Sequence, residues 1–96
     1  MTQPCVYILA SKRNGTLYVG VTSDAARRVG EHRGDWVDGF TKRDRVHQLV
    51  YAEFHETMLG AIQREKAIKK WRRALKLDLI ERANPDWRDL SGEIAA

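Results

Sequence analysis

Two tyrosines near the start of the chain, Tyr7 and Tyr18, are the first side chains with a chemistry to explain. Each lies in a short run of β-branched and aromatic residues bounded by turn formers, a composition that predicts a strand. Between the runs, the pair Asn14-Gly15 tolerates a positive φ and predicts a hairpin that brings the two phenols close together. A phenol with a pKa of about 10 is a poor base at neutral pH unless a cation stabilises the phenolate. Packing of both rings in the core is the competing interpretation.

Arg28 and His32 are four residues apart in a segment, 25–32, that follows the capping side chains of 22–24 and is predicted to be a short helix. On a helix the two side chains share one face, one turn apart. A guanidinium can hold two phosphate oxygens at once and neutralise charge that builds up at phosphorus, which points to phosphate chemistry. Arg27 is a competing candidate, and a solvated surface position is the alternative for Arg28 and His32.

Glu65 is the only acid between positions 57 and 77, within the longest helical pattern of the chain. The pattern predicts one amphipathic helix over 58–82, ended by Pro85, with an apolar stripe of Ala61, Ile68, Trp71, Leu75 and Leu79. On the shoulder of that stripe a carboxylate is partly desolvated, which is costly unless it is paired or bound to a cation. The alternative is a surface salt bridge to one of the flanking bases, Arg64, Lys66, Lys69 and Lys70.

Three predicted strands, at 5–10, 16–22 and 47–54, favour an α+β fold in which a small antiparallel sheet is flanked by helices. The 96 residues are expected to form one domain, because the chain is too short for a second core. Segment 33–45 combines four basic residues with two aromatic ones, which suits either a phosphate backbone or packing of a loop on the core. A single cysteine and the lack of a bilayer-spanning apolar run predict a cytoplasmic protein.

Charge is divided unevenly along the chain, whose net charge is +4. Residues 78–96 hold five acids and two arginines, a balance of −3, so residues 1–77 carry +7. A basic body points to a polyanionic partner, nucleic acid first and an anionic membrane surface second. The acidic end is expected to be a loosely held tail from about residue 86, with Trp87 and Leu90 docking back.

These residues, in this order, resemble the GIY-YIG nuclease superfamily. Its two motifs correspond to Cys5-Val6-Tyr7 and Tyr18-Val19-Gly20, in which the tyrosines and the last glycine are literal matches and Cys5 and Val6 depart from the pattern. Further matches in order and spacing extend the resemblance over most of the chain, and these are Thr22, Arg28, His32 and Glu65. The resemblance implies the α+β fold described above.

The resemblance also implies a role for each matching residue. Tyr7 would be the base or proton relay, Tyr18 would orient the attacking water, and His32 would lie near that water. Arg28 would steady the developing charge, and Glu65 would bind one Mg²⁺ or Mn²⁺ ion. The lack of a second clustered carboxylate favours one metal over two. Support for the site and contacts to phosphate are expected from Gly20, Lys12, Thr22, Lys69, Lys70, Arg72 and Arg73.

The function expected on this basis is metal-dependent hydrolysis of DNA phosphodiester bonds, in DNA repair, recombination or DNA processing. A nucleic-acid-binding module on the same scaffold that does not cut is the competing hypothesis. A third hypothesis is membrane binding through the basic segment 66–76. Contact with phosphate is the use that we expect of that segment. The expected partner is DNA, bound by a monomer or a weak dimer. The structure of the DNA, the choice between DNA and RNA, and a partner protein for targeting are left open.

Overall fold

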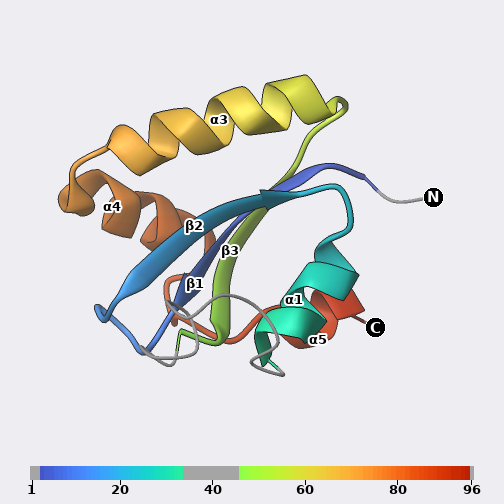
Figure 1. The fold of residues 1–96 in the computed structure, drawn as a ribbon. Helices are drawn as coiled ribbons and strands as arrows, with labels where there is room; N and C mark the ends of the chain where they lie inside the picture. Colours follow the sequence, from blue (N-terminus) through green and yellow to red (C-terminus); the bar gives the residue numbers. More distant parts are fainter. Residues whose placement is uncertain (1–2, 34–45, 96) are drawn as a thin grey trace.

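The fold is a three-stranded antiparallel sheet with helices on both faces, as the sequence predicted (Figure 1). The computed structural model describes residues 3–33 and 46–95. The strands are β1 (Cys5–Ala10), β2 (Leu17–Thr22) and β3 (Gln48–Phe54). Their order in the sheet is β2-β1-β3, so β1 is central and β2 and β3 form the two edges.

The described helices flank this sheet in two groups. They are α1 (Ala25–Arg33), α3 (Met58–Lys70), α4 (Arg73–Ala83) and α5 (Ser91–Ala95). Helices α3 and α4 cover one face of the sheet, and α1 and α5 pack together on the other (Figure 1). Within residues 3–33 and 46–95, no helix is both long and apolar enough to cross a membrane. Most of segment 33–45, with its basic and aromatic residues, lies outside the described residues.

The central strand β1 is buried along its whole length because both of its faces are covered. Side chains alternate between the two faces of a strand, so neighbouring residues enter different cores. Val6, Ile8 and Ala10 pack in the core beneath α3 and α4. The core beneath α1 and α5 receives Cys5, Tyr7 and Leu9. Alternation therefore turns Tyr7 toward the helix that carries Arg28.

The turn between β1 and β2 makes the reversal that Asn14-Gly15 predicted. Asn14 has a φ of 58°, in the left-handed region that asparagine tolerates. The Gly15 N–H donates to the Lys12 carbonyl at 2.9 Å and closes the turn. From α4, Arg73 Nη2 donates to the carbonyl oxygens of Asn14 and Gly15, at 2.7 and 2.6 Å. The hairpin tip is thus fastened to the helical layer.

The single helix predicted over 58–82 is wrong, because the chain breaks it into α3 and α4. At Trp71 and Arg72 the backbone is extended, with ψ angles of 145° and 156°. A straight helix over that segment would be about 37 Å long, whereas the longest extent of the molecule is 32 Å. The break folds α4 back, so that Ile80 packs in the same core as Ile68. Neither proline nor glycine marks the break in the sequence.

Residues 86–95 are packed on the sheet and on α1, where the sequence indicated a loosely held tail. Trp87 is buried and has a φ of 55°, which turns the chain back toward the sheet. The Leu90 N–H donates to the Leu49 carbonyl at 2.7 Å, and the Asp89 carboxylate accepts from the Leu49 N–H at 3.3 Å. These two bonds fasten the segment to β3. Trp87 and Leu90 both dock, as the sequence suggested.

Candidate active site

The ring of Tyr7 lies over Gly20, its partner across the β1–β2 pair. A Cβ atom at position 20 would be 2.5 Å from both Cζ and Oη of Tyr7, which is closer than any real contact. Position 20 therefore needs glycine so that the phenol can extend across β2 toward the edge of the sheet. The glycine that ends the second motif is explained by the tyrosine that ends the first.

Tyr18 lies next to this phenol on the same face of the sheet. It is opposite Leu9 in the β1–β2 register, so it is the diagonal neighbour of Tyr7. The two ring centroids are 6.3 Å apart, with 36° between the ring planes. That separation is within the range of interacting aromatic pairs. The hairpin thus places two phenols in one patch, as the sequence predicted.

Arg28 reaches this patch from α1. Its Nε donates to Tyr7 Oη at 3.4 Å, and its Nη1 lies 3.3 Å from a carboxylate oxygen of Glu31. The side chain of Arg28 is 33% exposed, so it is anchored on the protein and still reachable from solvent. Arg27, the competing candidate, is 76% exposed and pairs with Glu31. The arginine that meets the tyrosines is Arg28.

The protonation states of the pair follow from its surroundings. Burial raises the pKa of the Tyr7 phenol to about 12, although the hydrogen bond from Arg28 lowers it in part. The pKa of Arg28 is raised, chiefly by its hydrogen bond to Tyr7 and further by bonds to Tyr18 and Glu31, against the effect of burial. At neutral pH Tyr7 keeps its proton and Arg28 keeps its charge. The pair presents a hydroxyl and a fixed cation, a combination that suits phosphate.

The turn between β2 and α1 sets the direction of the helix that carries Arg28. Thr22 Oγ1 accepts from the Asp24 N–H at 3.0 Å, and Asp24 Oδ1 accepts from the Arg27 N–H at 3.2 Å. Both bonds satisfy amide groups at or just before a helix start, where no helical partner exists. Thr22, which the resemblance expects to support the site, lies in this turn.

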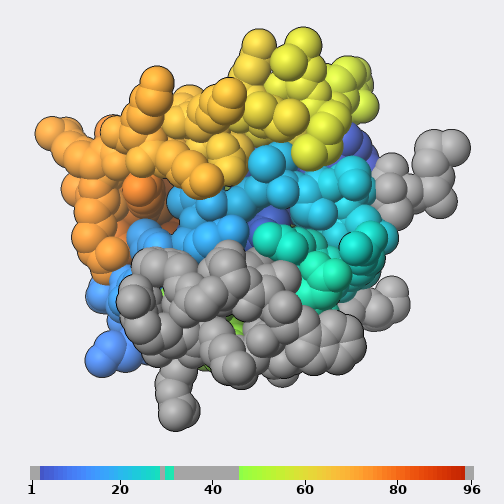
Figure 2. Space-filling model, viewed as in Figure 1, coloured from blue at the N-terminus to red at the C-terminus, as the bar shows by residue number. Residues whose placement is uncertain are grey.

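An open hollow of about 310 Å³ lies beside Arg28. Its lining comes from the end of β2, the first turns of α1 and the start of α3. These residues are Val21, Thr22, Ser23, Asp24, Arg27, Arg28, Glu31 and Met58. In Figure 2 some atoms of β1 (dark blue) are visible in the gap between β2 (blue) and α1 (blue-green). The hollow lies on the α1 side of this gap, and the residues of β1 stay buried beneath the surface.

Glu65 is on α3, on the other side of the sheet. It is 8% exposed and lies between the fully buried Ala61 and Ile68. Lys69 Nζ is 2.8 Å from its Oε2. Both features that the sequence left as alternatives are present, since the carboxylate is largely desolvated and also has a basic partner. Because α3 packs on β2 and β1, Glu65 approaches the edge strand from the face opposite to Tyr18.

The donor set at Glu65 fits a metal ion that keeps most of its own waters. Among residues 3–33 and 46–95, no group of three or more His, Cys, Asp or Glu side chains could enclose a metal. A fully protein-bound zinc or calcium ion does not fit such a set. Mg²⁺ commonly keeps several waters and takes one or two carboxylates together with substrate phosphate oxygens. A single carboxylate such as Glu65 fits that mode of binding.

The structure thus divides the predicted site residues into two groups. One patch on the α1 face brings together Tyr7, Tyr18, Gly20 and Arg28. Glu65 is held across the edge strand β2 from that patch. His32 lies in the last turn of α1, and its side chain is outside the part of the chain that the structure describes.

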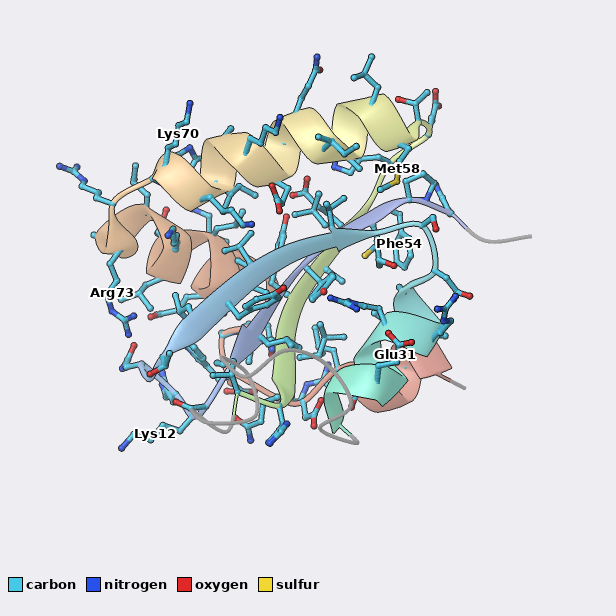
Figure 3. All side chains as sticks on the ribbon, in the orientation of Figure 1. Lys12, Glu31, Phe54, Met58, Lys70 and Arg73 are labelled. Carbon is cyan, nitrogen blue, oxygen red and sulfur yellow. The ribbon has the colours of Figure 1, made fainter. Side chains whose placement is uncertain are left out.

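The predicted phosphate contacts lie along one end of the molecule. Figure 3 shows Lys12 in the hairpin turn, Arg73 at the start of α4 and Lys70 at the end of α3, following one another along this end. Lys70 and Arg72 are exposed, as a phosphate contact requires. Lys69 already pairs with Glu65, and Arg73 already binds the hairpin carbonyls.

Glu31 is a residue of this region that the sequence reasoning missed. Its two carboxylate oxygens lie 3.2 Å from Arg27 Nε and 3.3 Å from Arg28 Nη1. The spacing of three and four residues along a helix was a signal that could have found it. Glu31 therefore ties both candidate arginines to one carboxylate.

A second cluster, centred on Glu53 of β3, was also missed and lies on the α3 face. The carboxylate accepts from Tyr51 Oη at 2.5 Å and from Arg64 Nε at 3.0 and 3.3 Å, and it lies 2.6 Å from His55 Nε2. Burial alone would raise the pKa of Glu53, but the hydrogen bonds from these three side chains lower it. Arg64 also stacks over Trp71, 5.1 Å from the ring centroid. Tyr51, Glu53 and His55 follow one another at intervals of two residues, a strand spacing that could have grouped them, whereas Arg64 comes from α3.

Comparisons with known proteins agree with the motifs. Residues 3–78 match the GIY-YIG catalytic domain. A UPF0213 protein of Syntrophus aciditrophicus (strain SB) is 39% identical over 87 residues, which are 90% of this chain and 98% of that protein. A UPF0213 protein of Staphylococcus saprophyticus is 38% identical over 80 residues, which are 83% of this chain and 96% of that protein.

A solved structure agrees with the fold. The solution NMR structure of a UPF0213 protein from Bacillus halodurans superimposes with a TM-score of 0.57 at 24% identity, over 91% of this chain and 92% of that one. The matched domain, 3–78, contains both tyrosine motifs, Arg28 and Glu65. The domain match and the two relatives together show that this chain belongs to the GIY-YIG family, a family of nucleases.

Proposed function

We propose that this protein is a metal-dependent endonuclease that hydrolyses phosphodiester bonds of DNA. The observation that carries the proposal is the phenol of Tyr7, which lies across Gly20 and is hydrogen-bonded to Arg28 beside a second phenol, Tyr18. Arg28 lines an open hollow as a fixed cation that is hydrogen-bonded to the buried Tyr7 hydroxyl, and a cation so placed suits a phosphate diester. The charge of +7 over residues 1–77 supports a polyanionic substrate.

In this proposal Tyr7 is a proton relay. Hydrolysis forms a bond from phosphorus to the water oxygen, breaks the bond to the leaving oxygen, and moves one proton from the former to the latter. A phenol with a pKa of about 12 is protonated at neutral pH, so it can accept the proton of the water only as it passes its own proton on. A hydroxyl has both a donor and an acceptor site, which such a relay needs. Tyr18 orients the water, and His32 lies near it.

Arg28 stabilises the negative charge that builds up on the phosphate oxygens. Its guanidinium is charged at every pH of interest and is held in place before the substrate arrives, so little reorganisation is needed in the transition state. Loss of one preorganised donor of this kind costs about 10²- to 10³-fold in kcat. Arg28 is therefore the side chain from which the proposal expects the largest effect.

Nucleases of this family use divalent metal ions, and Glu65 is the residue that would hold one here. A bound Mg²⁺ or Mn²⁺ ion would supply positive charge against the phosphate and the leaving oxygen. Lys69 neutralises Glu65 in the absence of such an ion, which stabilises a carboxylate that is 8% exposed. Lys12, Lys70 and Arg72 would bind the flanking phosphates without reading sequence. The corresponding processes are DNA repair, recombination or DNA processing.

The position of Glu65 favours one alternative, a nucleic-acid-binding module that does not cut. Its carboxylate is paired with Lys69 and approaches β2 from the face opposite to Tyr18. In a binding module, the pair would serve packing alone and the basic end would bind DNA. The two functions differ in their dependence on metal and on the charge of Glu65.

The test is cleavage of end-labelled single-stranded, duplex, flapped and branched DNA with Mg²⁺, Mn²⁺ or EDTA. Wild type is compared with Glu65→Gln and with Glu81→Gln, an exposed position on α4 that changes net charge equally. A nuclease cuts with metal, stops in EDTA and loses at least about 100-fold in Glu65→Gln only. If all three proteins bind DNA equally and none cuts, the binding module is the function.

A further inference from the structure

We propose that Glu31 is a positioning residue, which fixes the guanidinium of Arg28 against Tyr7 so that the arginine meets the substrate phosphate in one orientation. The inference rests on the proposed function for the phosphate, whereas its structural half, the fixing of Arg28, stands on contacts within this chain. The residues involved form a line from the core to the surface: Tyr7, Arg28, Glu31 and Arg27.

Contacts hold Arg28 at Nε and at Nη1, in addition to its hydrogen bond with Tyr18. Nε donates to Tyr7 Oη at 3.4 Å, and Nη1 lies 3.3 Å from Glu31 Oε1. A guanidinium is planar and its donors form a rigid fork, so two anchors on different nitrogens define the plane. Tyr7 is a fixed anchor because its ring is buried over Gly20. Glu31 supplies the second anchor, from one turn further along α1.

Arg27 holds Glu31 in turn. Its Nε lies 3.2 Å from Glu31 Oε2, so the two oxygens of one carboxylate bind two arginines. The side chains are 76% exposed for Arg27, 22% for Glu31 and 33% for Arg28. The Arg27 pair is solvated and weak by itself, whereas the Glu31–Arg28 contact is at the rim of the hollow, where a substrate phosphate would approach. Arg27 therefore holds the Glu31 carboxylate from the solvent side.

An ordinary helix ion pair is the competing explanation, because residues three and four apart on a helix pair frequently. Such a pair would stabilise α1 slightly. Arg28 would then keep the same position after the pair was removed. The two explanations differ in one respect. Only the positioning role makes the orientation of the Arg28 side chain, and the rate of the chemical step, depend on Glu31.

The first measurement is cleavage kinetics of Glu31→Gln, with Glu81→Gln as the control for the same change in net charge. Misplacement of a catalytic group lowers the rate of the chemical step, so we expect kcat to fall about 10- to 100-fold with little change in KM. Arg27→Ala should cause a smaller loss of the same kind. Loss of one acid anywhere strengthens binding to DNA, and that shared effect appears in Glu81→Gln as well. Equal kinetics in Glu31→Gln and Glu81→Gln would overturn the proposal.

The second measurement needs no nuclease activity. In protein labelled with ¹⁵N-arginine, the Arg28 Nε–H resonance, assigned by its loss in Arg28→Lys, reports hydrogen exchange at the bond to Tyr7. We expect exchange to be slow in wild type and in Glu81→Gln, and faster in Glu31→Gln and Glu31→Asp, whose shorter side chain breaks the contact. Circular dichroism shows that each variant is folded.

The two measurements separate the possible failures. If wild type does not cut DNA but Glu31→Gln speeds Nε–H exchange, the proposed nuclease function fails and the fixing of Arg28 by Glu31 stands. If exchange in Glu31→Gln and Glu31→Asp is as slow as in wild type, Glu31 does not position Arg28, whatever the cleavage data show.

Discussion

Two polar clusters of similar composition lie on opposite faces of the same small sheet. On the α1 face, Tyr7 and Glu31 both contact Arg28, so the cation is at the centre. On the α3 face, Tyr51 and Arg64 both donate to Glu53, so the anion is at the centre. Burial raises the pKa of both tyrosines, to about 12 in each case. The same residue types thus surround a central cation in one cluster and a central anion in the other.

The two clusters differ in what they leave for a ligand. Around Glu53, three side chains converge on one carboxylate that is 18% exposed, and the donors and the acceptor satisfy one another. A closed network of this kind contributes to stability and specifies the packing of α3 on β3. Around Arg28, a charged fork is held at the rim of an open hollow. An excess positive charge that is fixed and accessible is suited to binding an anion.

The largest effect we expect is on activity, from Arg28→Ala. Cleavage should fall about 10²- to 10³-fold because a preorganised donor to the phosphate is lost, while the melting temperature changes little. Single-turnover cleavage is the measurement, and Arg27→Ala is the control because it removes the same charge from the same helix. Equal losses in the two variants would show that charge, rather than the position of Arg28, matters.

Gly20→Ala should disturb the α1-face cluster through packing. The added Cβ would lie 2.5 Å from Tyr7 Cζ and Oη, so the ring must move, at a cost of about 1 to 3 kcal/mol in unfolding free energy. Gly30→Ala in α1 is the control, because its Cβ meets nothing within 4 Å. That variant should be more stable than wild type by about 0.5 to 1 kcal/mol. Urea unfolding gives both values, and equal stability of Gly20→Ala and wild type would contradict the close approach.

Glu53→Gln should separate the two clusters by affecting stability alone. The variant weakens bonds from Tyr51 and Arg64 that are partly buried, and we expect a loss of about 1 to 3 kcal/mol. Glu56→Gln, at a nearby exposed position, should stay within about 0.5 kcal/mol of wild type. Thermal and urea unfolding measure the loss. Cleavage per folded molecule should be unchanged, and a matching loss of activity would mean that the closed cluster also takes part in function.

The pH dependence of stability should differ between the clusters, with smaller effects. The pKa of Glu53 is lowered from 4.5, so its contribution is complete above pH 4.5 and is lost as the pH falls through its folded-state pKa. The pKa of Tyr7 is raised from 10 to about 12, so its contribution is complete below pH 10 and is lost as the pH rises through about 12. Urea unfolding across pH should therefore show a weaker acid loss in Glu53→Gln and a weaker alkaline loss in Tyr7→Phe. Unchanged profiles in both variants would contradict these assignments.

Several elements could be predicted from local pattern. The strand bounds differ by at most one residue from those expected, because alternation and turn chemistry are properties of neighbouring residues. The four-residue spacing from Arg28 to His32 and the family resemblance favoured Arg28 over Arg27, and α1 brings Arg28 to Tyr7. The break at Trp71 could not be predicted, because it depends on how much core surface α4 can cover.

The sequence by itself determined the hairpin, the pairing of the two tyrosine motifs and the basic charge of the body, since these follow from composition and short-range spacing. Only the tertiary structure decided which helix covers which face, and with it the position of Glu65 across β2 from Tyr18 and the closed cluster at Glu53. Tyr51, Glu53 and His55 are neighbours along one strand, but Arg64 and Glu65 reach the sheet from a separate helix. Their contacts depend on sheet register and on the packing of helices, which no repeating pattern within a single segment encodes.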